Sequence, residues 1–139
     1  MSSPDDSRPV TLVLDTSAVL AFAGGSMHVH EPILIAEETG EDVAVPAACL
    51  LESVRRDPGV NLHELLHHPQ VLVVTLDRAD DDLLLDWTLY YGGREDLAAA
   101  AVLSYRHRRC SVRTGDPDAY AIGGRRPTGS FRSMTPGSP

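Results

Sequence analysis

Four carboxylates in this 139-residue chain have positions that suggest chemistry, namely Asp15, Glu52, Asp96 and Asp116. A carboxylate that directly follows a buried apolar run, as Asp15 does, is not explained by packing, because an isolated charge is costly there. Two carboxylates about 4 Å apart repel by roughly 4 kcal/mol at an effective dielectric constant of 20, so a cluster of four needs a cation. Oxygen-only ligation suits Mg²⁺ or Mn²⁺, and such a cluster is typical of phosphoester hydrolysis.

Ordinary structural interpretations of the same acids stay open. With 20 acidic residues in the chain, some fall near strand ends by chance. Asp96 could serve only as a favourable charge in the first turn of a helix, and Asp116 only as a turn residue before Pro117. Glu95 stands beside Asp96, so the sequence leaves open whether it contributes as well. Asp15 is the strongest candidate, because the run Leu-Val-Leu ends abruptly at this ionisable residue.

The hydrophobic runs predict the strands that must position these acids. Residues 10–14 and 71–76 are nearly continuous apolar runs, typical of strands buried on both faces of a parallel sheet. Shorter strands are expected at 43–45 and 110–114. Because the carboxyl ends of parallel strands meet at one edge of the sheet, where ligands of such sheets bind, the four acids are expected to converge there.

Helical segments alternate with these strands. Their expected ranges are 18–23, 30–38, 47–56, 61–68, 78–91 and 95–108. Pro32 is expected in the first turn of its helix, where its missing amide proton costs little. The alternation predicts an α/β fold with a small, mostly parallel central sheet and helices on both faces. We expect a polar lead over 1–9, one domain over 10–122, and a flexible basic tail without a strand over 123–139.

Composition limits the classes of function. The net charge is −8, which by itself argues against a nucleic-acid partner. All 12 basic residues are arginine, however, and the last 39 residues carry seven of them against two acids. No apolar run is long enough to span a membrane, and the polar acidic N-terminus is unlike a secretory signal. Two cysteines in apolar surroundings, Cys49 and Cys110, indicate reduced thiols, so we expect a cytoplasmic protein without a membrane partner.

The acidic segments together resemble the four signature segments of PIN domains, and most closely those of VapC-type toxins from bacterial toxin–antitoxin pairs. They are 13–20 (Val-Leu-Asp-Thr-Ser-Ala-Val-Leu), 45–52 (Val-Pro-Ala-Ala-Cys-Leu-Leu-Glu), 94–102 (Arg-Glu-Asp-Leu-Ala-Ala-Ala-Ala-Val) and 112–117 (Val-Arg-Thr-Gly-Asp-Pro). The resemblance implies a three-layer α/β/α domain. It also implies an endoribonuclease dependent on Mg²⁺ or Mn²⁺, acting as a toxin with a cognate antitoxin protein as partner. A homodimer is left open.

The resemblance also assigns roles to residues of this chain. Asp15, Glu52, Asp96 and Asp116 would be the catalytic and metal-binding acids. Thr16, Ser17 and Thr114 would be neighbouring hydroxyls that hold a carboxylate, a water or a phosphate. For Ser17, capping the following helix is an equal alternative. In-line attack on RNA would leave a 5′-phosphate and a 3′-hydroxyl.

Arginines are the expected contacts to the RNA backbone. The candidates are Arg106, Arg108, Arg109 and Arg113, with Arg125, Arg126 and Arg132 in the tail. The cluster over 106–109 has an equally good alternative, because basic residues at the end of a helix also favour its dipole.

Two other functions are open at the level of sequence. A PIN-like domain without catalysis could act as a binding or regulatory module that uses the same face. Residues 63–67 also match the H-E-x-x-H pattern of zinc metalloproteases, in which His63 and His67 lie on one helical face. Pro69 ends that helix early and no third-ligand segment is evident, so a surface helix is the favoured interpretation.

Overall fold

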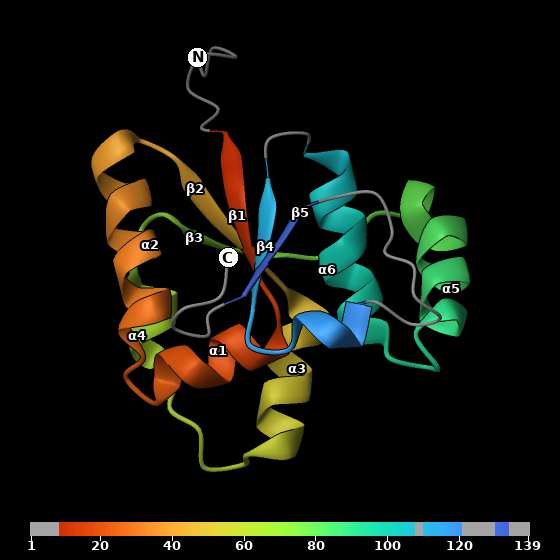
Figure 1. Cartoon of the computed structure of the whole chain (residues 1–139), viewed down its shortest axis with the longest axis horizontal. Coiled ribbons are helices and arrows are strands. Elements are labelled where there is room, and N and C mark those ends of the chain that lie inside the picture. Colours follow the sequence, from red (N-terminus) through yellow and green to blue (C-terminus); the bar gives the residue numbers. More distant parts are fainter. Residues whose placement is uncertain (1–8, 108–109, 121–129, 134–139) are drawn as a thin grey trace.

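A five-stranded sheet forms the centre of the protein (Figure 1). The computed structural model describes residues 9–107, 110–120 and 130–133. The strand order is β3-β2-β1-β4-β5, and every neighbouring pair is parallel. The strands are β1 (Val10–Leu14), β2 (Asp42–Pro46), β3 (Val71–Val74), β4 (Ser111–Thr114) and β5 (Ser130–Ser133). The predicted parallel α/β fold is confirmed.

Helices connect these strands and cover both faces of the sheet. The α-helices are α1 (Thr16–Ala23), α2 (Met27–Thr39), α3 (Ala47–Arg56), α4 (His63–His67), α5 (Asp81–Tyr90) and α6 (Glu95–Arg106). Two short 3-10 helices are η2 (Arg78–Asp80) and η3 (Pro117–Tyr120). Within the described ranges no single helix is long and apolar enough to cross a membrane, and only α1 and α2 taken together, across a 97° bend, meet that test.

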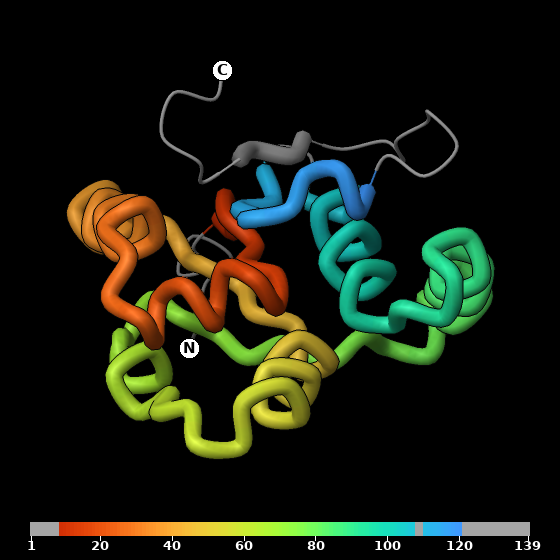
Figure 2. Tube along the Cα trace, turned by 60° about the horizontal axis from the view of Figure 1, so that its bottom comes forward, coloured from red at the N-terminus to blue at the C-terminus, as the bar shows by residue number. Residues whose placement is uncertain are grey.

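The core has two halves because successive strand side chains point to opposite faces. Leu12 and Leu14 of β1 pack with α1, α2 and α4 on one face. Val13 of β1 packs with α6, Cys49 of α3 and Tyr91 on the other. Figure 1 shows α2 and α4 on one side of the strands and α6 on the other, and in Figure 2 helix α5 lies outside α6. This layering is the three-layer α/β/α arrangement expected from the sequence.

The carboxyl edge of the sheet is where the helices that carry the acids begin. β1 runs into α1 at Asp15, and β2 runs into α3 at Pro46. Figure 1 shows α1, α3 and the start of α6 together below the strands. The fold therefore places the start of three helices at one end of the sheet.

Two local predictions were wrong. α2 begins at Met27, so Pro32 lies inside the helix rather than in its first turn. Residues 130–133 form strand β5, which pairs with β4 from Ser111↔Ser130 to Thr114↔Ser133, although no strand was expected after Ala121. An edge strand needs backbone pairing on one side only and no long apolar run, so local hydrophobicity does not predict β5. The other residues of the predicted tail, 121–129 and 134–139, lie outside the described ranges.

Candidate active site at the carboxyl edge of the sheet

Asp15 is a buried carboxylate at the junction of β1 and α1, with 1% of its surface exposed. It caps α1 by accepting a hydrogen bond from the Ala18 backbone N–H (3.0 Å), and it accepts a second from the Ser17 hydroxyl (2.7 Å). The Tyr120 hydroxyl donates to its other oxygen (2.7 Å). Burial nevertheless raises the pKa of Asp15 above its ordinary value. The fold thus keeps the Asp15 carboxyl group at a position where burial disfavours its ionised form.

Asp96 is the second buried carboxylate and lies in the first turn of α6, 4% exposed. Arg94 donates to both of its oxygens, from Nε to Oδ1 (2.9 Å) and from Nη2 to Oδ2 (2.8 Å). The Thr16 hydroxyl also donates to Oδ2 (2.6 Å). Burial opposes ionisation, but these donors outweigh it and hold the pKa of Asp96 below its ordinary value. Asp96 is therefore an ionised carboxylate with a built-in counter-ion.

Glu52 approaches Asp96 from α3. Both side chains line a pocket of about 300 Å³, which Glu95, Arg55 and Arg94 also border. Glu52 is itself bound by arginines on its own helix: Arg55 donates from Nε (2.9 Å) and Arg56 donates from Nε (2.9 Å). The hydrogen bond from Arg55 is the main reason that the pKa of Glu52 is lowered. The pocket thus contains three acids, of which Glu52 and Asp96 are paired with arginines.

The three predicted hydroxyl residues form a network around these carboxylates. Thr16 connects to Asp96, as described above, while Ser17 lies 3.2 Å from the Thr114 hydroxyl at the end of β4. Ser17 also accepts a hydrogen bond from the Gly115 backbone N–H (2.8 Å). The N-cap of α1 is Asp15, not Ser17, so the alternative interpretation of Ser17 was wrong. The hydroxyl of Ser17 instead links Asp15 to the loop that follows β4.

Asp116 is near this network but is not part of the buried cluster. Its backbone N–H donates to the Thr114 hydroxyl (3.0 Å), and the residue is exposed. No hydrogen bond or ion pair joins its carboxylate to the other three acids in the described part of the chain. The structure therefore brings Asp96 and Glu52 to one pocket, buries Asp15 next to Thr16, the residue that donates to Asp96, and leaves Asp116 at the surface.

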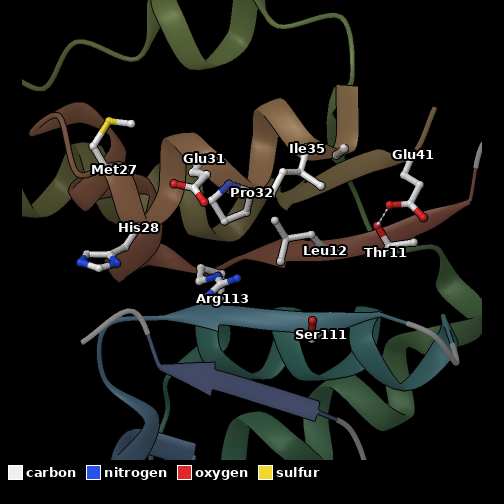
Figure 3. Close-up of a pocket in the computed structure, with 11 residues that line it drawn as sticks. Thr11, Leu12, Met27, His28, Glu31, Pro32, Ile35, Glu41, Ser111 and Arg113 are labelled. Atoms are coloured by element: carbon white, nitrogen blue, oxygen red, sulfur yellow. Dashed lines mark hydrogen bonds between the residues drawn. The ribbon is translucent and has the colours of Figure 1, made fainter. Parts of the chain in front are cut away.

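The predicted RNA-contacting arginines lie elsewhere or outside the described ranges. Arg106 is at the opposite end of α6 from Asp96, about 15 Å along the helix axis, and its Nη1 binds buried Asp80 (2.6 Å). Arg113 lines a separate hollow of about 580 Å³ between α2 and β4 (Figure 3). Arg108 and Arg109 fall outside the described residues. Neither described arginine faces the acidic pocket.

The H-E-x-x-H segment forms α4, a helix of only five residues. The rings of His63 and His67 stack with centroids 6.2 Å apart, and Glu64 lies 3.9 Å from His30. Within the described ranges no third Asp, Glu, His or Cys joins them in a metal-binding group. This geometry gives the zinc metalloprotease alternative no support.

Sequence reasoning missed three residues that shape the site. Arg94 and Tyr120 bind Asp96 and Asp15, as described above. The Cys49 thiol donates to the Asp96 backbone carbonyl (3.3 Å), and burial beside Asp15 and Asp96 raises its pKa well above the ordinary value, so it stays neutral. The only sequence signal for Arg94 was its place two residues before Asp96. Tyr120 had no signal, because its contact with Asp15 spans 105 residues.

The carboxylate oxygens of this site are ligands that a hard divalent cation prefers, but the positions of the side chains do not form a metal site. Asp15, Asp96 and Glu52 supply only oxygen, as Mg²⁺ and Mn²⁺ prefer, and a guanidinium already occupies both oxygens of Asp96 in the way a cation would. In the described part of the chain, however, no three Asp, Glu, His or Cys side chains stand close enough to hold an ion. Binding a metal would therefore require Arg94 or Glu52 to move.

Comparison with known proteins gives a match in structure but not in sequence. No family model matches the chain, and no curated protein matches it. One chain of the solved structure described as DNA-bound VapBC from Salmonella typhimurium superposes with a TM-score of 0.58 at 13% identity, covering 91% of this chain and 99% of that one. At that identity the likeness shows the fold alone. The protein therefore has a PIN-like α/β/α fold, as its four acidic segments predicted.

Proposed function

We propose that this protein is a divalent-metal-dependent endoribonuclease and the toxin of a toxin–antitoxin pair. The observation that carries the proposal is the pair of buried carboxylates, Asp15 and Asp96, on separate elements at the carboxyl edge of a parallel sheet. Thr16, the residue after Asp15, donates a hydrogen bond to Asp96. Packing does not explain these two carboxylates, because removing each of them from water costs free energy. The PIN-like fold supports a nuclease at this position.

The residues of the site would have two roles, metal binding and the positioning of the metal-binding carboxylates. Asp15, Asp96 and Glu52 would hold Mg²⁺ or Mn²⁺, and Asp116 would approach from the loop after β4. The metal would supply the positive charge that polarises a scissile phosphate and acidifies a water. Thr16, Ser17 and Tyr120 fix the two buried carboxylates with hydrogen bonds, so those oxygens need little reorganisation when substrate binds.

A nuclease assay tests the proposal directly. Purified wild-type protein should cleave a labelled single-stranded RNA with Mg²⁺ or Mn²⁺, and EDTA should stop the reaction. Asp96→Asn and Glu52→Gln should each lower the rate by more than about 100-fold, because loss of outer groups alone costs 10- to 100-fold. Asp86→Asn, which removes an exposed acid from α5, is the matched control and should cleave like wild type. Equal cleavage by folded Asp96→Asn would contradict the site.

A second function is favoured by one observation. Arg94, Arg55 and Arg56 already neutralise Asp96 and Glu52, as expected of a PIN-like module that binds a partner without catalysis. Isothermal titration with Mn²⁺ beside the nuclease assay separates the two functions. Saturable Mn²⁺ binding with no RNA turnover would support the binding module, whereas binding with turnover supports the nuclease.

Partners of this protein would be RNA and a cognate antitoxin, while a homodimer is left open. The similar VapBC structure is that of a complex with DNA, which supports an antitoxin partner. Leu51 on α3 and Leu85 and Leu89 on α5 are 73%, 59% and 70% exposed, so apolar surface is available for such contacts. With RNA as substrate and its thiols reduced, the protein would act in the cytoplasm. Copurification with the product of a neighbouring gene tests the antitoxin.

A further inference from the structure

Arg94 binds the carboxylate of Asp96 that a metal at this site would also bind. Its guanidinium uses both carboxylate oxygens, and Thr16 donates to one of them as well. Asp96 is 4% exposed, whereas the side chain of Arg94 is 37% exposed, so the guanidinium closes the buried carboxylate from the solvent side. Arg94 and Asp96 both line the pocket, so an ion bound there would lie against the guanidinium as well as the carboxylate.

Arg94 lies between a glycine turn and the buried part of α6. Arg94 is the residue before the first turn of α6, and its own side chain makes no capping hydrogen bond. It follows Gly92 and Gly93, whose φ angles of 67° and 90° turn the chain from α5 into α6. The core residues of α6 begin after it, at Asp96 and Leu97. The guanidinium can therefore leave Asp96 without repacking the core.

The arginines at Glu52 differ from Arg94 in their setting. Arg55 is 73% exposed and belongs to the same helix as Glu52, so water screens this pair. The partner of Arg94 is buried, and a buried carboxylate that loses its counter-ion is strongly disfavoured. Asp96 therefore needs one cation at all times, either the guanidinium or a metal.

We propose that Arg94 is an internal counter-ion that competes with the divalent metal for Asp96. It neutralises Asp96 in the metal-free protein and gives up at least one carboxylate oxygen when Mg²⁺ or Mn²⁺ binds. The inference rests on the proposed function, since it assumes that a metal binds at this site. It makes Arg94 a positioning residue that sets the metal concentration at which the site fills.

Calorimetric titration of Mn²⁺ into purified full-length protein tests this competition. Arg94→Gln should bind Mn²⁺ about tenfold more tightly than wild type, because one charge-assisted bidentate pair no longer has to be broken. Arg94→Lys, which keeps the charge but not the fork, should have intermediate affinity. Arg106→Gln is the matched control: it also removes an arginine from a buried aspartate, Asp80, but at the far end of α6, and it should leave the Mn²⁺ affinity unchanged.

A structural role of Arg94 predicts a different result. Loss of a merely structural ion pair would lower the melting temperature without tightening Mn²⁺ binding. Equal or weaker Mn²⁺ affinity in Arg94→Gln, while wild type binds, would overturn the inference and leave the metal-dependent function standing. Absence of Mn²⁺ binding in wild type and variants alike would overturn both. If Arg94→Gln does not fold, Arg94→Lys carries the same comparison, and wild-type affinity in that variant would overturn the inference.

Discussion

Asp15 is the residue at which the proposed function and the stability of the fold are opposed most directly. It is 1% exposed and accepts three hydrogen bonds, yet burial still disfavours its charge. A residue kept only for folding would not need to be ionisable at this position, because an amide could cap α1 as well. A carboxylate here, rather than an amide, fits the proposed metal site, which would need its charge.

Asp15→Asn should raise the free energy of unfolding by about 1–3 kcal/mol, the scale of a buried polar group's desolvation cost, while it abolishes RNA cleavage. The asparagine oxygen keeps the hydrogen bonds from Ser17 and Ala18, and its NH₂ can donate to Tyr120. Urea denaturation measures the change. Asp116→Asn, at an exposed acid, is the control and should leave stability unchanged. A less stable Asp15→Asn protein would show that the charge supports the fold.

The same substitution predicts a pH dependence with a definite sign. The pKa of Asp15 is raised in the folded protein above the ordinary value of 3.8, so the folded state holds this proton more tightly than the unfolded state does. Ionisation therefore costs stability: the cost is absent below about pH 3.8 and grows as the pH rises through the folded pKa. The stability gain of Asp15→Asn should accordingly increase from pH 4 towards neutral pH. A gain that is the same at each pH would exclude ionisation as its cause.

At the scale of elements, the turn between α5 and α6 positions Asp96 and Arg94. Gly92 and Gly93 both have positive φ angles, which residues other than glycine rarely adopt. The turn lets α6 begin at the carboxyl edge of the sheet while α5 packs outside it. A change in the turn should therefore affect both the stability and the site.

Gly93→Ala should lower the free energy of unfolding by about 1–2 kcal/mol, because alanine at a φ of 90° is strained. It should also weaken cleavage, because Arg94 and Asp96 follow directly. Gly59→Ala is the matched control, since Gly59 has no positive φ and an added methyl would meet only the Asp57 side chain at 3.8 Å. Chemical denaturation of the two variants measures the difference, and equal stability would show that the turn tolerates a side chain.

At the scale of the whole molecule, the net charge of −8 does not argue against a nucleic-acid substrate if the proposed metal binds. Part of that acidity is gathered at one edge of the sheet, where a bound divalent cation would reverse the local sign. A ligand that binds only the folded chain also stabilises it. Metal binding should therefore raise the free energy of unfolding as well as support activity.

Mn²⁺ at a free concentration 100 times its Kd should raise the free energy of unfolding by about 2.7 kcal/mol, and EDTA should reverse the effect. Thermal melts with and without Mn²⁺ measure the shift. Asp96→Asn should lose it, because the substitution removes one ligand charge. An equal shift in Asp96→Asn would place the ion elsewhere on the protein.

Local patterns in the sequence predicted most of the elements, although not β5, and the position of each acid along them. Apolar runs predicted β1 and β3, and the alternation of strands with helices predicted a parallel sheet, because each depends on local periodicity. The ion pairs of Glu52 with Arg55 and Arg56 could also be predicted from the sequence, because residues three and four apart contact each other on a helix. These features follow from neighbours along the chain.

Tertiary structure alone decided which groups meet. Thr16 reaches Asp96 across 80 residues and Tyr120 reaches Asp15 across 105, so both contacts exist only after the sheet has formed. β5 is a strand because β4 offers it a free edge, and the exposed position of Asp116 is set by the loop after β4. Arg94 meets Asp96 because it lies before the helix, where the spacing rules of helices do not apply. Burial and long-range contacts, which no local pattern encodes, thus decide which of the acids belong to the candidate site and which groups bind them.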